Sequence, residues 1–215
     1  MTEQSDSALA TAPRHERAPD RRKARQVMDG ARRAFLADGF DGASMNEIAA
    51  AAGVSKGTLY AYYPSKAALF EALVREDRRA QAERLAPYDY EGPAEEVLMR
   101  LGVSVMELML EPAHVEQVRI VTGAAAKFPE IGRAFYEAGP LFGQKKLAHW
   151  LARRVEAGEL AIADVDLASV QFFNLAQGAL FKRMLFDGAA TPTREEIVAT
   201  VQSATAVFLA AYRAR

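Results

Sequence analysis

The chain has 215 residues, of which 27 are Lys or Arg and 28 are Asp or Glu, so its formal net charge is -1. This length allows a helical domain of ordinary size together with a smaller module. A balanced charge excludes a global positive excess, so any DNA affinity must come from a local patch. The absence of cysteine excludes disulfides, thiolate metal sites and cysteine nucleophiles. It fits a reducing cytoplasm, where we expect the protein to be located.

Residues 1–20 are polar and charged and contain no apolar run, which argues against a secretory signal and predicts a disordered basic arm. Residues 14–33 contain eight basic and three acidic side chains, a local excess of five positive charges. We predict that this patch supplies affinity for DNA phosphates that does not depend on base sequence.

Apolar residues recur at helical spacing along almost the whole chain, and no run alternates with a period of two, which predicts an all-α fold without strands. The first helix should run from about Arg21 to Asp38, with Gly39 as a left-handed cap at its end. Ser44 should begin the second helix through a capping box with Glu47.

A glycine turn should follow the second helix, because Gly53 tolerates the positive φ that a sharp turn demands. Ser55 caps a short third helix that should end near Tyr63, and a long fourth helix should begin after Pro64. We therefore predict that residues 21–66 form a three-helix, helix-turn-helix DNA-binding domain and that residues 67–215 form a C-terminal helical domain for effector binding and dimerisation.

Glycine and proline divide the rest of the chain into further helices, and Leu167–Phe186 is its most apolar stretch. Polar side chains interrupt that stretch, which favours a buried helix over a membrane span, so we expect no membrane partner. The predicted helices are residues 94–110, 113–127, 130–138, 141–157, 166–187 and 194–213.

The segment 43–73 contains the residues that indicate a function. The N-terminus of its third predicted helix carries Ser55, Lys56, Gly57 and Thr58, which supply hydroxyls, one positive charge and almost no bulk. Such a helix end offers free N–H groups and a positive dipole to phosphate. Tyrosines and a lysine nearby add further donors, so this pattern indicates a DNA-binding surface.

Residues 25–73 closely resemble the DNA-binding domain of tetracycline-repressor (TetR) type regulators. The most specific part of the resemblance runs from Ile48 through Gly53 to Lys66, with Phe70 beyond it. It implies a one-component transcription regulator, by default a repressor, that binds a palindromic operator in double-stranded DNA as a dimer. It also implies release from DNA by a small hydrophobic effector. Residues 127–137 resemble an element of the AcrR-like branch of these regulators.

The resemblance implies a role for individual residues of the DNA-binding surface. Side chains at the starts of the second and third helices would bond phosphates or approach the groove, and Lys56 and Gly57 would meet base edges. Ala61 stands where the family often has a larger side chain, which leaves base specificity open. The predicted DNA-binding residues are Ser44, Asn46, Ser55, Lys56, Gly57, Thr58, Tyr60, Tyr62 and Lys66.

The family architecture implies a homodimer through the last two predicted helices, Leu167–Phe186 and Arg194–Arg213, which would form a four-helix bundle with their counterparts. It also implies an effector cavity of unknown ligand in the C-terminal domain. For each aromatic candidate core packing is the favoured alternative to ligand contact, and for the amides on the predicted helix 166–187 a dimer-interface hydrogen bond is an equal alternative. The candidate lining residues are Met106, Gln117, Phe128, Phe135, Trp150, Phe173, Asn174 and Gln177.

An enzyme is the main alternative class. The three histidines have no neighbours at metal-ligand spacing, and neither a nucleophile motif nor a phosphate-binding glycine loop occurs. We therefore expect no enzyme activity, no cofactor and no metal. A second alternative is an architectural DNA-binding protein without an effector, against which the long, aromatic-rich C-terminal part argues. Release of DNA by a hydrophobic compound would separate this alternative from a regulator.

Overall fold

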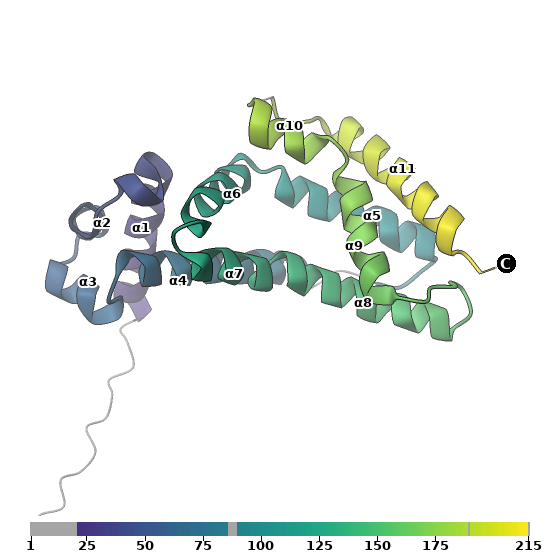
Figure 1. Cartoon of the computed structure of the whole chain (residues 1–215), viewed down its shortest axis with the longest axis horizontal. Coiled ribbons are helices and arrows are strands. Elements are labelled where there is room, and N and C mark those ends of the chain that lie inside the picture. Colours follow the sequence, from purple (N-terminus) through teal and green to yellow (C-terminus); the bar gives the residue numbers. More distant parts are fainter. Residues whose placement is uncertain (1–20, 86–89, 189, 215) are drawn as a thin grey trace, which may run out of the picture.

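The computed structural model describes residues 21–85, 90–188 and 190–214, and these residues form an all-α structure (Figure 1). Across the described ranges no strand occurs, and Leu160 and Arg213 form an isolated β-bridge. The all-α prediction is thereby confirmed. The helices are α1 (Arg21–Gly42), α2 (Met45–Ala52), α3 (Lys56–Tyr62), α4 (Lys66–Leu85), α5 (Ala94–Met109), α6 (Pro112–Ala125), α7 (Pro129–Ala138), α8 (Pro140–Glu156), α9 (Val165–Gln177), α10 (Leu180–Asp187) and α11 (Arg194–Tyr212).

Helices α1, α2 and α3 lie together at one end of the elongated molecule, and α4 leads from them into the rest (Figure 1). α1 and α2 pack closely, because a Cβ added to Gly30 would lie 2.5 Å from the Cβ of Ala52. Gly39 has φ 68° and interrupts the helical geometry, as predicted, but helical turns resume after it as far as Gly42. The predicted loop after Gly39 is therefore shorter than expected.

The hydrophobic core formed by α1, α2, α3 and α4 extends beyond these helices. Phe35 of α1, Leu59 of α3 and Phe70 of α4 are fully buried in one cluster. The same cluster contains Val121 of α6 and Ile131 of α7. The helix-turn-helix end and the remainder of the chain thus share a hydrophobic core.

Two further clusters fill the C-terminal part. One surrounds Trp150, whose indole nitrogen donates to the backbone oxygen of Tyr90 at 3.0 Å, and the other surrounds Met106. α5 and α11 approach closely, since a Cβ added to Gly102 would lie 2.5 Å from Cγ1 of Val201. These clusters hold α5, α8, α9, α10 and α11 together.

The prediction of one continuous helix over 166–187 is wrong. α9 ends at Gln177 and α10 begins at Leu180, because Gly178 has φ 50° and ψ -135°, which no helix contains. A Cβ at this glycine would lie 2.9 Å from Thr200, so the close approach of α11 also requires glycine here. The apolar pattern continues through the break, which explains why the pattern predicted a single helix.

Within the described part of the chain, no helix is long and apolar enough to cross a membrane. The predicted basic arm, residues 1–20, lies outside the described residues, and so do Arg14 and Arg17 of the basic patch.

Candidate DNA-binding surface and an adjoining pocket

A serine caps the N-terminus of each helix of the helix-turn-helix unit, α2 and α3. The Ser44 side chain accepts from the backbone N–H of Glu47, and the Glu47 carboxylate accepts from the Ser44 N–H at 2.8 Å, which completes the predicted capping box. Ser55 caps α3 through the N–H of Thr58. Between them Gly53 adopts φ 63°, the left-handed conformation that the turn requires. Local sequence therefore dictates the angle between α2 and α3.

The start of α3 faces solvent. Ser55, Lys56, Gly57 and Tyr60 are exposed, and the Lys56 ammonium lies 5.9 Å from the centre of the Tyr60 ring. Leu59 on the opposite side of α3 is fully buried. α3 thus presents one polar, positively charged edge outward and anchors itself by a single apolar side chain.

The remaining predicted contact residues differ in their surroundings. Ser44 and Asn46 are exposed at the start of α2, whereas Thr58 and Tyr62 are half-buried. The Thr58 hydroxyl lies 2.8 Å from the Ser55 hydroxyl, so it already has a hydrogen-bond partner within the cap. The structure brings these residues onto α2 and α3 at the same end of the molecule.

Lys66 makes internal contacts that the sequence pattern did not reveal. Its ammonium donates to the backbone oxygens of Asp41 at 3.2 Å and Ala43 at 2.8 Å, and it lies 4.7 Å from the centre of the Phe40 ring. Lys66 therefore ties the start of α4 to the last turn of α1 and to Ala43, which follows it, and this is a structural role.

In the basic patch, too, some residues are exposed and others make contacts within the protein. Arg22, Lys23 and Arg25 are exposed on the first turns of α1. Arg33 donates to the backbone oxygen of Ala51, and Arg32 pairs with aspartates, so these two arginines serve the fold. Two of the positive charges of the patch are therefore engaged within the protein.

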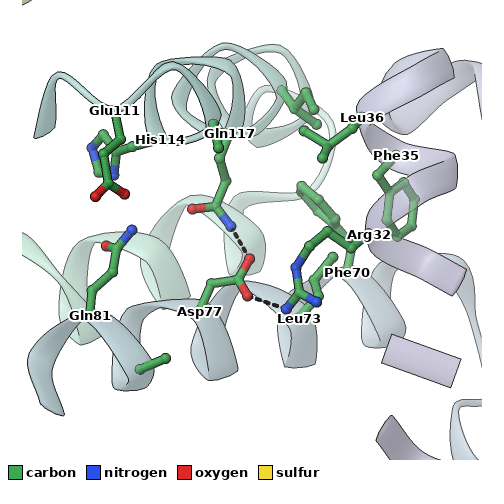
Figure 2. Close-up of a pocket in the computed structure, with 13 residues that line it drawn as sticks. Arg32, Phe35, Leu36, Phe70, Leu73, Asp77, Gln81, Glu111, His114 and Gln117 are labelled. Carbon is green, nitrogen blue, oxygen red and sulfur yellow. Dashed lines mark hydrogen bonds and ion pairs between the residues drawn. The ribbon is translucent and has the colours of Figure 1, made fainter. Parts of the chain in front are cut away.

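A pocket of about 240 Å³ lies where α1, α4 and α6 meet (Figure 2). One end is apolar and touches α1, and the other end is polar and lies between α4 and α6 (Figure 2). The lining residues are Arg32, Phe35, Leu36, Phe70, Leu73, Asp77, Ala80, Gln81, Glu111, Ala113, His114, Gln117 and Ile120.

Asp77 is the centre of a chain of polar contacts across this pocket. One carboxylate oxygen accepts from Arg32 of α1 at 2.5 Å, and the other accepts from the Gln117 amide of α6 at 2.7 Å (Figure 2). The Gln117 carbonyl accepts from Arg78, whose other terminal nitrogen contacts Nδ1 of His114 at 3.0 Å. The three helices are thus joined by a continuous network of side chains.

Arg78 and His114 are buried at the inner end of this network, with 4% and 6% of their surfaces exposed. Burial lowers the pKa of Arg78 to about 10, and the neighbouring Asp77 carboxylate opposes this shift. Burial and the Arg78 charge together lower the pKa of His114 to about 3, so its imidazole is neutral at physiological pH. An arginine can only donate, so Nδ1 of His114 must accept and Nε2 must carry the proton.

Of this junction, only Gln117 was among the site residues predicted from the sequence. Asp77 and Arg78 fall on the inward side of α4, at helical spacing from Phe70 and Leu73, and charged residues at such positions signal a buried polar network. That signal was available in the sequence. The partners on α1 and α6 are distant along the chain and could not be paired with them without the structure.

The predicted effector-lining residues are distributed over several parts of the described core. Of the eight, only Gln117 lines the pocket between α1, α4 and α6. Phe128 and Phe135 pack against the core shared by both ends, Trp150 and Phe173 belong to a second cluster, and Met106 to a third. Asn174 is exposed on α9, and the half-buried Gln177 amide donates to the Met109 sulfur at 3.7 Å.

A short exposed helix held against its partner by a left-handed glycine is the geometry of a helix-turn-helix DNA-binding protein. Residues 27–73 match the family model described as bacterial regulatory proteins, tetR family. Residues 96–214 match a second model, described as the C-terminal domain of AefR-like transcriptional repressors. The chain therefore belongs to the TetR family of bacterial regulators, as the sequence resemblance predicts.

Among curated proteins, the chain is 43% identical over 58 residues to the HTH-type transcriptional repressor Rv1474c of Mycobacterium tuberculosis, a match that covers 27% of this chain and 31% of that protein. It is 36% identical over 61 residues to the HTH-type transcriptional repressor AcnR of Corynebacterium efficiens, which covers 28% and 32%. The matched part spans about a third of the length of these relatives.

Two solved structures match over almost their whole length. The flavonoid-responsive regulator FrrA has a TM-score of 0.80 at 34% identity and covers 90% of this chain and 98% of its own. A TetR family transcriptional regulator from Pseudomonas syringae pv. tomato str. DC3000 has a TM-score of 0.73 at 27% identity and covers 91% and 99%.

Proposed function

We propose that the protein is a ligand-responsive transcriptional repressor that binds a palindromic operator as a homodimer and leaves it when a small hydrophobic effector binds. The observation that supports this most is the exposed edge of α3, where Lys56 and Tyr60 stand on a helix fixed by the Gly53 turn. In this geometry α3 enters the major groove. Residues 21–66 act as the DNA-binding domain and residues 67–215 as the effector-binding and dimerisation domain.

The proposed DNA contacts follow from position and exposure. Lys56 and Gly57 reach base edges, and Asn46 points toward the groove from α2. Ser44, Ser55, Thr58, Tyr60 and Tyr62 contact the phosphate backbone. Lys66 supports the loop before α2 through two of its three donors and offers the third to phosphate.

The outer face of α11 supports the proposed dimer. Residues 197–212 contain no charged side chain, although a helix face that remains in water normally carries charges. Ala199, Ser203, Ala206 and Ala210 are exposed at helical spacing along this face. Small residues let a second copy of α11 approach closely. Exposed Leu167 and Leu175 on α9 and Phe186 on α10 add apolar surface to be covered.

The effector is proposed to be a small aromatic molecule. A relative of nearly equal length is named a flavonoid-responsive regulator, which supports an aromatic effector for this chain. The named relatives are transcription regulators, and we propose no catalytic activity. Because the protein is proposed to meet DNA, its location is proposed to be the cytoplasm.

The experiment that tests this function is selection of bound sites from random double-stranded DNA by the full-length protein. The expected result is a palindrome whose half-sites are separated by about one helical turn, 34–36 Å, or a multiple of it. Selection of no sequence above background would overturn the proposal and favour an architectural protein. Adding an aromatic compound to the bound operator then tests release.

A further inference from the structure

The pocket between α1, α4 and α6 combines an apolar end and a polar end along two turns of α4. Leu36, Phe35 and Phe70 form the apolar end, whereas Gln81 and His114 lie at the other (Figure 2). From Leu73 to Gln81 a helix rises about 12 Å. A ligand that used both ends would therefore be elongated, with an apolar group against α1.

The volume of the pocket limits the ligand. An apolar cavity of about 150 Å³ accepts benzene, and drug-sized ligands occupy pockets of about 300–1,000 Å³. At about 240 Å³ this pocket lies between the two. It has room for one aromatic ring and a short chain.

The polar end offers hydrogen bonds that nothing in the described structure uses. Nε2 of His114 carries a proton because Nδ1 accepts from Arg78, and no described atom accepts this proton. The Gln81 amide, which is half-buried, likewise has no partner among the described residues. Both groups can donate to a ligand oxygen.

The charges around the pocket disfavour an anion. Arg32 and Asp77 of the lining pair with each other. The Asp77 carboxylate is already satisfied by Arg32 and by Gln117. Arg78 lies behind the wall and directs its terminal nitrogens at His114 and Gln117. Arg32 and Arg78 are thus already engaged by protein side chains, and a neutral ligand needs no counter-charge.

We propose that this pocket binds an uncharged molecule made of one aromatic ring and a short chain that ends in a hydrogen-bond acceptor. The ring lies against Leu36 and Phe70, and the acceptor receives hydrogen bonds from His114 and Gln81. If the regulatory function proposed above holds, such a ligand touches α1 of the DNA-binding domain directly. Filling the pocket then moves α1 relative to α4 and α6 without a relay through the C-terminal core.

The test is a titration of the full-length, DNA-free protein with three probes of the same ring and similar length, followed by calorimetry. The probes are 4-phenylbutan-2-one, which is neutral with an acceptor, 4-phenylbutyrate, which is an anion, and butylbenzene, which has no acceptor. We expect the ketone to bind about tenfold more tightly than either of the others. Equal affinities for ketone and butylbenzene, or tightest binding of the acid, would overturn the proposal.

A pair of tryptophan variants locates the binding. Ala113→Trp places a bulky ring at the exposed rim of the pocket, and Ala126→Trp places it at the other, exposed end of α6. Binding of the ketone should be lost in the first variant and unchanged in the second. Unchanged binding to a folded Ala113→Trp protein would exclude the pocket.

The Gln81→Leu variant tests whether the Gln81 amide recognises the ligand's acceptor or the ligand only fills the pocket. It keeps the approximate volume of the side chain and removes one donor, so the preference for ketone over butylbenzene should fall severalfold. An unchanged preference would overturn the assigned role of Gln81. Operator release is measured separately. If the ketone binds the pocket but leaves operator affinity unchanged, the proposed binding site stands and its proposed role in regulation is contradicted.

Discussion

Arg32 of α1 and Asp77 of α4 form an ion pair across the boundary between the helix-turn-helix end and the rest of the chain, with 2.5 Å between Nη2 and Oδ1. The same arginine also pairs with Asp29, on its own helix, at 3.1 Å. The first pair joins two helices and is half-buried, while the second joins two turns of one helix and lies closer to solvent.

These two pairs give a matched comparison. Asp77→Asn should lower the free energy of unfolding by about 1–2 kcal/mol, because it removes a charge partner from two hydrogen bonds in a partly buried place. Asp29→Asn should cost less than about 0.5 kcal/mol, as is usual for an exposed pair on one helix. Urea unfolding of both variants measures the difference. Equal losses would mean that the contact between α1 and α4 contributes nothing specific.

The helix break at Gly178 predicts whether a substitution there stabilises or destabilises the protein. Gly178→Ala should destabilise the protein by about 1–3 kcal/mol, because alanine rarely adopts this backbone conformation and its Cβ would meet Thr200. Gly123→Ala, on the exposed side of α6 with no atom near its Cβ, should instead stabilise by up to about 1 kcal/mol. Thermal unfolding checks both. A stabilising Gly178→Ala would indicate that α9 and α10 form one helix.

His114 predicts a dependence of stability on pH. Its pKa in the folded protein is about 3 and its ordinary value is 6.5, so below pH 6.5 the unfolded chain takes up a proton that the folded protein does not. Stability should therefore fall as pH decreases from 6.5, by up to about 1.4 kcal/mol per pH unit from this group. His114→Gln should flatten the profile between pH 8 and pH 5. A wild-type slope in His114→Gln would refute this assignment.

Neighbouring tyrosines distinguish DNA contact from structural support. Tyr62→Phe should weaken operator binding by about 1 kcal/mol for all DNA sequences alike, because Tyr62 is proposed to donate a hydrogen bond to phosphate. Tyr63→Phe should leave binding unchanged, because Tyr63 packs against the shared core. Lys56→Ala should alter which sequences are preferred. Binding measured against the selected palindrome and a scrambled duplex separates these effects, and wild-type behaviour of all three variants would contradict the placement of α3.

The uncharged outer face of α11 predicts an interface. Ala206→Glu should place an uncompensated charge between two copies and weaken the dimer by several kcal/mol, whereas Ala126→Glu on the exposed end of α6 should have no effect. Sedimentation equilibrium measures the dissociation. A fully dimeric Ala206→Glu protein that still binds the palindrome would place the interface elsewhere.

Features encoded by neighbouring residues were predictable from the sequence. The caps at Ser44 and Ser55 and the turn at Gly53 depend on residues within four positions of one another, and the structure contains all of them. The break at Gly178 was not predicted, since the apolar repeat passes through it. The network around Asp77 joins residues up to 45 positions apart, and helical periodicity carries no information about such pairs.

The core shared by α1, α4, α6 and α7 bears on how these regulators can be recombined. Val121, Ala124 and Ile131 pack directly against the helices that hold the turn, so a cut near residue 66 would pass through the interior and not through a linker. Fusing the helix-turn-helix end of this chain to the C-terminal domain of another regulator would bring together two apolar surfaces that are not complementary in shape. A hybrid that also takes α6 and the start of α7 from this chain would keep that packing and move the seam to helices outside the shared interior.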